Sequence, residues 1–245
     1  MERIITMENI RKFAYVSDAV CQKPIRGIVV FFFGLGGDDM YDEEAADGIM
    51  FGREGILYVV PYNNPWAWMN RQAVAYTDEI LDVLFEAYNL PADTPVVAMG
   101  GSMGGHGALI YTKYSKRTPV LCDVNCPVCD MVYHFTERKD LPRTIYSSLF
   151  NEEGTLEDAL KRVSPYHLAE ELPKVKYMIF HCDEDGAVNL EKHSGRFVER
   201  MREVGHDISL DIVHGRGHCD LSSEMWEKYE QACITAVNEY HASKA

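Results

Sequence analysis

The stretch VVAMGGSMGGHGAL, residues 96–109, decides the fold that this sequence predicts. It opens with an apolar run of strand length, and an apolar helical pattern follows the glycines. Between them GGSMG, residues 100–104, has the form G-x-S-x-G. Glycines beside the serine let strand and helix backbones approach closely, and the strained turn makes the hydroxyl project from the sheet edge. A plain Gly-rich turn is the alternative, but the strand before it and the helix after it favour a catalytic serine at Ser102.

Strands and helices alternate on both sides of this stretch. Such alternation implies right-handed crossovers, so it predicts an α/β fold with a doubly wound, mostly parallel sheet. Active groups in such sheets lie on loops after the carboxyl ends of the strands. Buried strands are expected at residues 28–33, 56–60, 96–99, 120–124, 177–181 and 208–213, short edge strands at 4–6 and 12–17, and helices at 71–88, 103–114, 190–204 and 224–240.

Residues 134–172 break the alternation. The segment is mixed and charged, with helices expected at 156–163 and 166–171 and no convincing strand. We therefore predict one domain, residues 1–245, in which residues 134–172 form a small helical cap insertion at the sheet edge.

The composition limits the kinds of binding partner and the cellular location that can be expected. A hydrophobic content of 47% and a charged content of 25% are ordinary for a globular protein. The net charge of −14 disfavours nucleic acid or an anionic membrane as a partner. No run is apolar enough to span a bilayer, and residues 1–8 lack the apolar core of a signal peptide. With seven cysteines and no sign of a disulfide framework, a cytoplasmic location is expected.

Two later loops can supply the base and the carboxylate that a serine nucleophile needs. The strand expected at 177–181 runs into HCDEDGAV, residues 181–188, and the strand at 208–213 is followed by HGRGHCD, residues 214–220. Both loops follow strand carboxyl ends, and together with Ser102 they give the chain order Ser…Asp…His of an α/β-hydrolase.

At these motifs the chain resembles small α/β-hydrolases of the esterase and prolyl-oligopeptidase-like kind, from about Ile28 to the C-terminus. Residues 100–109 are similar to the nucleophile turn of the esterase D and acetyl-esterase groups. The family's acid commonly stands in H-G-x-x-D-x-x-V, which residues 181–188 match with Cys182 in place of glycine. The resemblance therefore implies Asp185 as the acid, with Asp183 and Glu184 as alternatives.

The same resemblance points to the base. The family usually has G-x-G-H, and residues 215–218 match it, which implies His218. His214 stands at the strand end and is expected to be structural. His106 lies in the first turns of the helix after the serine, where a packing role is expected.

An oxyanion hole needs backbone N–H donors that are fixed before the reaction. Met103 follows the nucleophile at a helix N-terminus, whose dipole also favours negative charge. The second donor is expected in the loop after residues 28–33, at Leu35 or, as second choice, at Gly34. Relatives often carry H-G-x-G-G there, and here Phe33 replaces the histidine. A Gly-rich turn without this role is the alternative.

The loop at residues 61–70 also follows a strand, so Tyr62, Trp66 and Trp68 are candidates to line an acyl or leaving-group pocket. The tryptophans can equally seal the base of the cap.

Cys122, Cys126 and Cys129 have the C-x3-C-x2-C spacing of enzymes that bind an iron–sulfur cluster and S-adenosylmethionine. The first of them falls inside an apolar strand, where it behaves as a small buried hydrophobe. We therefore expect no metal and no organic cofactor.

Together these features predict a serine hydrolase that cleaves carboxylic esters of small or aromatic acyl groups through an acyl-enzyme on Ser102. The expected partner is a small-molecule ester, and homo-oligomerisation is left open. A serine peptidase of the prolyl-oligopeptidase-like kind acting on short peptides is one alternative. A catalytically silent binding protein with the hydrolase fold is the other.

Overall fold

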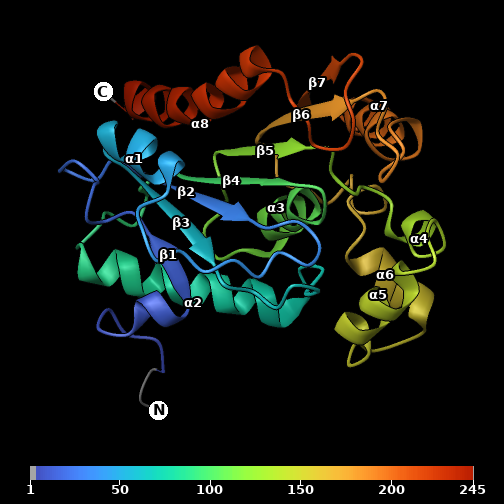
Figure 1. Cartoon of the computed structure of the whole chain (residues 1–245), viewed down its shortest axis with the longest axis horizontal. Coiled ribbons are helices and arrows are strands. Elements are labelled where there is room, and N and C mark those ends of the chain that lie inside the picture. The colour runs from blue at the N-terminus through green and yellow to red at the C-terminus, as the bar shows by residue number, and fades with distance from the viewer. Residues whose placement is uncertain (1–3, 245) are drawn as a thin grey trace.

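The computed structural model describes residues 4–244, so residues 1–3 and 245 of the predicted domain lie outside it. Its centre is a seven-stranded sheet with the order β1-β3-β2-β4-β5-β6-β7 (Figure 1). The β1–β3 pair is antiparallel and the other pairs are parallel, which confirms the mostly parallel α/β class. The strands are β1 (Ala14–Val16), β2 (Gly27–Phe32), β3 (Ile56–Pro61), β4 (Val96–Gly101), β5 (Leu121–Asn125), β6 (Lys176–Cys182) and β7 (Asp207–Val213).

Helices cover both faces of the sheet (Figure 1). They are α1 (Ala46–Arg53), α2 (Arg71–Ala87), α3 (Met103–Tyr114), α7 (Arg196–Glu203) and α8 (Ser223–Lys244), with a short 3₁₀ turn η1 (Ile10–Lys12) before β1. Successive strand side chains point to opposite faces. Val30 therefore packs in the core with α2, α3 and α7, whereas Val29 packs in the core with α1 and α8. The sheet is doubly wound, as predicted.

The strand register brings four loops to one edge of the sheet. At the carboxyl ends Phe32 of β2 pairs with Gly100 of β4, and Gly101 pairs with Asn125 of β5. Further along, Cys182 of β6 pairs with Val213 of β7. The loops after β2, β4, β6 and β7, which carry the candidate site residues, therefore leave the sheet side by side.

The N-terminal strand expected at residues 4–6 is wrong, because a turn forms there. The Thr6 amide donates to Asn9 Oδ1 at 2.8 Å, and the Asn9 amide donates to Thr6 O at 3.1 Å. An asparagine side chain that bonds the backbone locally competes with strand pairing. The edge strand expected at 12–17 is present as β1.

Two helix predictions need correction. The helix expected at 166–171 is a series of turns, since Pro165 and Pro173 leave too few residues between them for a stable helix. The helix expected at 190–204 begins as a π-helical turn, η2 (Glu191–Gly195), in which the Gly195 amide bonds to Leu190 O at 2.8 Å. The short helix α1 was not predicted.

Three helices join β5 to β6: α4 (Met131–His134), α5 (Leu141–Leu149) and α6 (Leu156–Arg162). They gather beyond the carboxyl ends of the central strands (Figure 1). In α5 a buried face forms from Leu141, Ile145 and Leu149, spaced four residues apart. Thr155 and Asp158 form a capping box that starts α6. We keep the name cap for residues 134–172.

Within residues 4–244 no helix combines the length and the apolar character that crossing a membrane requires.

Candidate active site

Ser102 stands between the end of β4 and the start of α3, at φ 57° and ψ −124°. Its amide donates to Asn125 O at 2.8 Å, which ties the turn to β5. A side-chain carbon at Gly104 would lie 1.9 Å from Phe32 O, and one at Gly100 would lie 2.5 Å from Gly104 O. Only glycine fits where β2, β4 and α3 approach so closely, as the sequence predicted. The strained turn holds the serine hydroxyl beyond the sheet edge.

The structure brings Ser102, His218 and Asp185 together from three loops. His218 Nε2 lies 2.9 Å from Ser102 Oγ, and His218 Nδ1 lies 2.6 Å from Asp185 Oδ2. Both distances are within hydrogen-bond range. With Nδ1–H donating to the carboxylate, Nε2 is free to accept the serine proton.

Asp185 is held as an anion. Its Oδ1 accepts the amides of Ala187 and Val188 at 2.8 and 2.9 Å, and His181 Nε2 lies 3.4 Å from Oδ2. Burial favours the neutral acid, but the hydrogen bonds from His181, His218 and the two amides outweigh it and hold the pKa of Asp185 well below its usual range. The carboxylate is therefore present at neutral pH.

The pKa of His218 shifts in the opposite direction to that of Asp185. Burial of the ring disfavours the cation, but the hydrogen bond and charge of Asp185 outweigh it and raise the pKa of His218. An imidazolium formed during a reaction is thus stabilised by the neighbouring carboxylate.

The alternative residues lie elsewhere. Asp183 accepts from His214 Nδ1 and from the Gly215 amide, both at 2.7 Å, so it joins the loops after β6 and β7 at the surface. The Glu184 amide donates to Arg216 O, which ties the same two loops. His106 is fully buried, and its Nε2 lies 2.7 Å from Val163 O.

The predicted oxyanion donors border the serine. Met103 is the first residue of α3, so its amide has no partner within the helix. Gly34 and Leu35 line the cavity over Ser102, and a carbon built on Gly34 would lie 3.8 Å from Ser102 Cβ. The loop is fixed by bonds from the Gly36 amide to Pro65 O and from the Gly37 amide to Gly34 O.

Phe33, which stands where relatives have histidine, packs instead of bonding. Its ring stacks on Tyr41 with centroids 6.1 Å apart, and it meets Phe31 edge-on. The residue therefore stabilises the loop by apolar contact.

A cavity of about 450 Å³ opens over Ser102 and His218. Trp68 lines it, and its Nε1 donates to Thr144 Oγ1 of α5 at 3.2 Å, so this side chain borders both the cavity and the cap. Tyr62 and Trp66 do not line it. They line a neighbouring cavity of about 490 Å³. The loop turns after them, at Trp68 and Met69, both at φ 45°. The other apolar walls of the serine cavity are Phe31, Leu35, Leu141, Val188 and Trp226.

The three cysteines of the C-x3-C-x2-C pattern do not gather into a metal-binding group among residues 4–244. Cys122 is fully buried in β5, and burial raises the pKa of its thiol. Cys126 Sγ lies instead beside the Cys182 and Cys219 amides, each at 3.4 Å. The pattern reflects packing under the loops.

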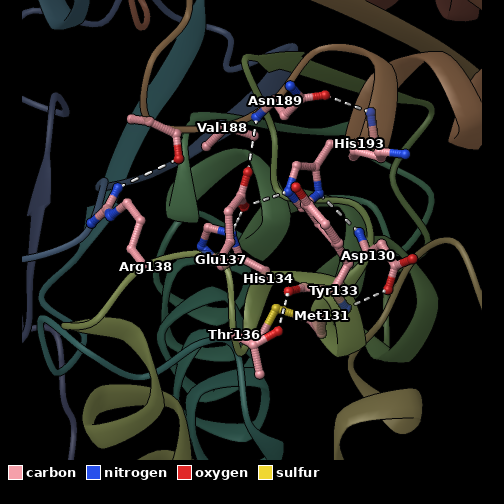
Figure 2. Close-up of polar contacts among 12 residues, drawn as sticks. Asp130, Met131, Tyr133, His134, Thr136, Glu137, Arg138, Val188, Asn189 and His193 are labelled. Atoms are coloured by element: carbon pink, nitrogen blue, oxygen red, sulfur yellow. Dashed lines mark hydrogen bonds and ion pairs between the residues drawn. The ribbon is translucent and has the colours of Figure 1, made fainter.

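Several residues that line the cavity were not predicted from the sequence. Cys219 Sγ lies 3.8 Å from His218 Nε2, and Asn125 and Arg138 line the cavity. His134 also lines it, and its Nδ1 lies 2.7 Å from Glu137 Oε2 (Figure 2). The spacing H-x-x-E at 134–137 was a visible signal for that pair, but nothing in the sequence placed it at the serine.

Comparison with solved structures shows the same fold. Puromycin hydrolase in complex with PGG is 16% identical with a TM-score of 0.71, over 90% of this chain and 35% of that one. Pyrococcus horikoshii acylaminoacyl peptidase is 10% identical with a TM-score of 0.64, over 87% and 36%. The chain thus spans about a third of the length of these two proteins. Thermogutta terrifontis esterase 2, phosphonylated by sarin, is 19% identical with a TM-score of 0.65, over 95% and 90%.

A comparison with curated protein sequences finds no match. The sequence model of the prolyl oligopeptidase family matches residues 79–236, which is more than half of the chain and includes Ser102, Asp185 and His218. The chain belongs to the prolyl oligopeptidase family and has the α/β-hydrolase fold.

Proposed function

We propose that this protein is a carboxylesterase that works through an acyl-enzyme on Ser102. The observation that carries the proposal is the hydrogen-bonded series Ser102–His218–Asp185, at 2.9 and 2.6 Å, under a cavity with apolar walls.

In the first half-reaction Ser102 Oγ attacks the ester carbonyl carbon while its proton passes to His218 Nε2. The carbonyl oxygen becomes an oxyanion, which the amides of Met103 and Leu35 stabilise, with Gly34 as the second choice in that loop. The C–O bond to the alcohol then breaks, and His218 returns the proton to the leaving oxygen. Asp185 keeps Nδ1 protonated and stabilises the imidazolium throughout.

In the second half-reaction water takes the place of the alcohol. His218 Nε2 accepts a proton from water, the hydroxide attacks the acyl carbon, and the Ser102–acyl bond breaks as Oγ recovers its proton. The products are a carboxylic acid and free enzyme, so the scheme balances with these residues and water.

One feature favours an ester over a peptide substrate. Aromatic and aliphatic side chains from the cap and from the β3–α2 loop, Leu141 and Trp68, border the cavity and suit a small or aromatic acyl group. A serine peptidase acting on short peptides is the second candidate, because the family model that matches is that of prolyl oligopeptidase.

Fluorophosphonate labelling, run beside 4-nitrophenyl esters of increasing acyl length and peptide 4-nitroanilides, separates the candidates. We expect label on Ser102 and turnover of the short esters. Label with preferential anilide turnover would instead identify a peptidase. If the folded protein takes no label, the result would favour a catalytically silent binding protein.

A further inference from the structure

A second imidazole–carboxylate pair faces the serine cavity. His134, at the end of α4, lines this cavity, and its ring meets Trp68 edge-on with centroids 5.4 Å apart. Its Nδ1 lies 2.7 Å from Glu137 Oε2. Its Nε2 has no hydrogen-bond partner among residues 4–244, yet it is not among the fully buried unpaired atoms. This nitrogen is therefore the polar edge of the ring that the cavity reaches.

Glu137 is a pure acceptor. Besides His134, its Oε2 lies 3.0 Å from His193 Nε2, and its Oε1 accepts the Asn189 amide at 3.3 Å (Figure 2). Burial favours the neutral acid, but the hydrogen bonds from His134 and His193 outweigh it and lower the pKa of Glu137 to about 2. An ionised carboxylate donates no hydrogen bond, so each neighbouring nitrogen must donate to it.

His193 has its proton position set by the backbone. Its Nδ1 accepts the amides of Cys129 and Asp130 at 3.1 and 3.2 Å. Nδ1 therefore carries the lone pair, and Nε2 carries the hydrogen that points at Glu137. A metal ion held by His134, Glu137 and His193 would need the lone pair on that Nε2, although their ligand atoms lie within 4.8 Å of one another. The arrangement is a hydrogen-bond relay.

The same argument determines which ring nitrogen of His134 carries the hydrogen. Burial outweighs the nearby carboxylate and lowers the pKa of His134, so the ring is neutral at neutral pH. Nδ1 faces the carboxylate and carries the single ring hydrogen, which leaves the lone pair on Nε2. The cavity thus meets a fixed hydrogen-bond acceptor on its cap side.

We propose that His134 Nε2 accepts a hydrogen bond from a neutral donor on the bound substrate, a hydroxyl or an amide N–H, with Glu137 as the positioning residue. This inference rests on the proposed function, since the substrate is the one that acylates Ser102. A hydroxyl or an amide N–H supplies the single hydrogen that the Nε2 lone pair of a neutral imidazole accepts. The preference selects among esters and takes no part in proton transfer at Ser102.

The test uses substrate pairs in which only the donor differs. In 4-nitrophenyl 3-hydroxybutyrate and 3-methylbutyrate a hydroxyl replaces a methyl group, and in the N-acetylglycine and 4-oxopentanoate esters an N–H replaces a CH₂. Hydroxyethyl and propyl butyrate place the same change on the alcohol. We expect the wild type to favour the donor member of at least one pair by roughly five- to tenfold in kcat/KM, as one neutral hydrogen bond allows.

His134→Phe keeps the ring but removes the acceptor, so it should bring that ratio close to one while the donor-free member reacts as before. Glu137→Gln no longer forces the hydrogen onto Nδ1, and it should reduce the ratio as well. If the His134→Phe variant does not fold, Glu137→Gln tests the same role of His134 Nε2 in substrate preference. His167→Phe, on the cap but away from the cavity, is the matched control and should leave the ratio unchanged.

Labelling of Ser102 by fluorophosphonate separates the two hypotheses. A wild type that takes no label refutes the proposed function. A labelled wild type with no donor preference in any pair, or with a preference that survives in both folded variants, refutes the role of His134 alone.

Discussion

Asp185→Asn tests the proposed site most sharply, because it changes one proton position. The carboxamide oxygen of the new side chain can still accept the Ala187 and Val188 amides, so the loop should keep its shape. The carboxamide nitrogen then faces His218 Nδ1 and donates to it. The ring hydrogen is driven onto Nε2, which faces Ser102 Oγ at 2.9 Å and can no longer accept the serine proton.

The wrong tautomer should lower kcat by roughly 10⁴, as the same change does in serine proteases, which corresponds to about 5 kcal/mol of transition-state stabilisation. The substitution also removes the charge that raises the pKa of His218, while burial of the ring remains. The acid limb of the residual activity should therefore move to lower pH than in the wild type. Both effects are measured from initial rates on a 4-nitrophenyl ester between pH 5 and 9, a range chosen to bracket about 6.5, the ordinary pKa of histidine.

Asp183→Asn is the matched control. Asp183 bonds to His214 and Gly215 in the neighbouring loop, so its loss should change kcat by no more than a few-fold. An Asp185→Asn enzyme within tenfold of the wild type, or one whose acid limb stays in place, would refute the role given to Asp185.

Three further predictions concern the same loops. Ser102→Ala should lower kcat by a factor on the order of 10⁶ and abolish fluorophosphonate labelling while the thermal midpoint is kept; activity that survives would refute the nucleophile. In the wild type, kcat/KM should fall as the pH decreases through a midpoint above about 6.5, because His218 acts as a base only when neutral and Asp185 raises its pKa; a flat profile down to about pH 4 would exclude a histidine base. Gly104→Ala should lower the free energy of unfolding by at least about 3 kcal/mol in urea titrations, since its new carbon would lie 1.9 Å from Phe32 O. Gly186→Ala, which meets nothing within 4 Å, should change it by less than about 0.5 kcal/mol.

The order and type of the sheet elements were predictable because each strand is a short apolar run with a clear end. The runs that became β2, β4 and β7 end in glycines or polar residues, and parallel strands place such ends at one edge. Ser102, Asp185 and His218 could therefore be grouped by their positions after strands, without knowledge of any contact. The same rule put the loop at residues 61–70 near the serine, and of its three candidate residues Trp68 lines the serine cavity while Tyr62 and Trp66 line the neighbouring one. The position of a strand fixes where a loop starts, whereas the direction of each side chain depends on the backbone conformation within the loop, which the sequence pattern does not specify.

The cap was predictable only in part, since its helices are short and amphipathic and their stability comes from tertiary packing. The segment 156–163 carries a capping box and was recognised, whereas α5 owes its place to the burial of Leu141, Ile145 and Leu149. The partner of Glu137 lies 56 residues further on, at His193, so the relay has no local signature.

One short backbone segment, residues 187–189, hydrogen-bonds the carboxylates of both Asp185 and Glu137. The amides of Ala187 and Val188 hold Asp185, and the next amide, that of Asn189, holds Glu137 of the cap. Val188 also lines the cavity, and its carbonyl accepts from His181 Nε2 at 3.0 Å. Because consecutive amides of one backbone segment serve both anions, the loop cannot shift to favour one imidazole without disturbing the other. The cap is therefore positioned against the proposed catalytic acid by the same backbone that keeps this acid ionised, which is why a residue remote in sequence can present a fixed acceptor to the substrate.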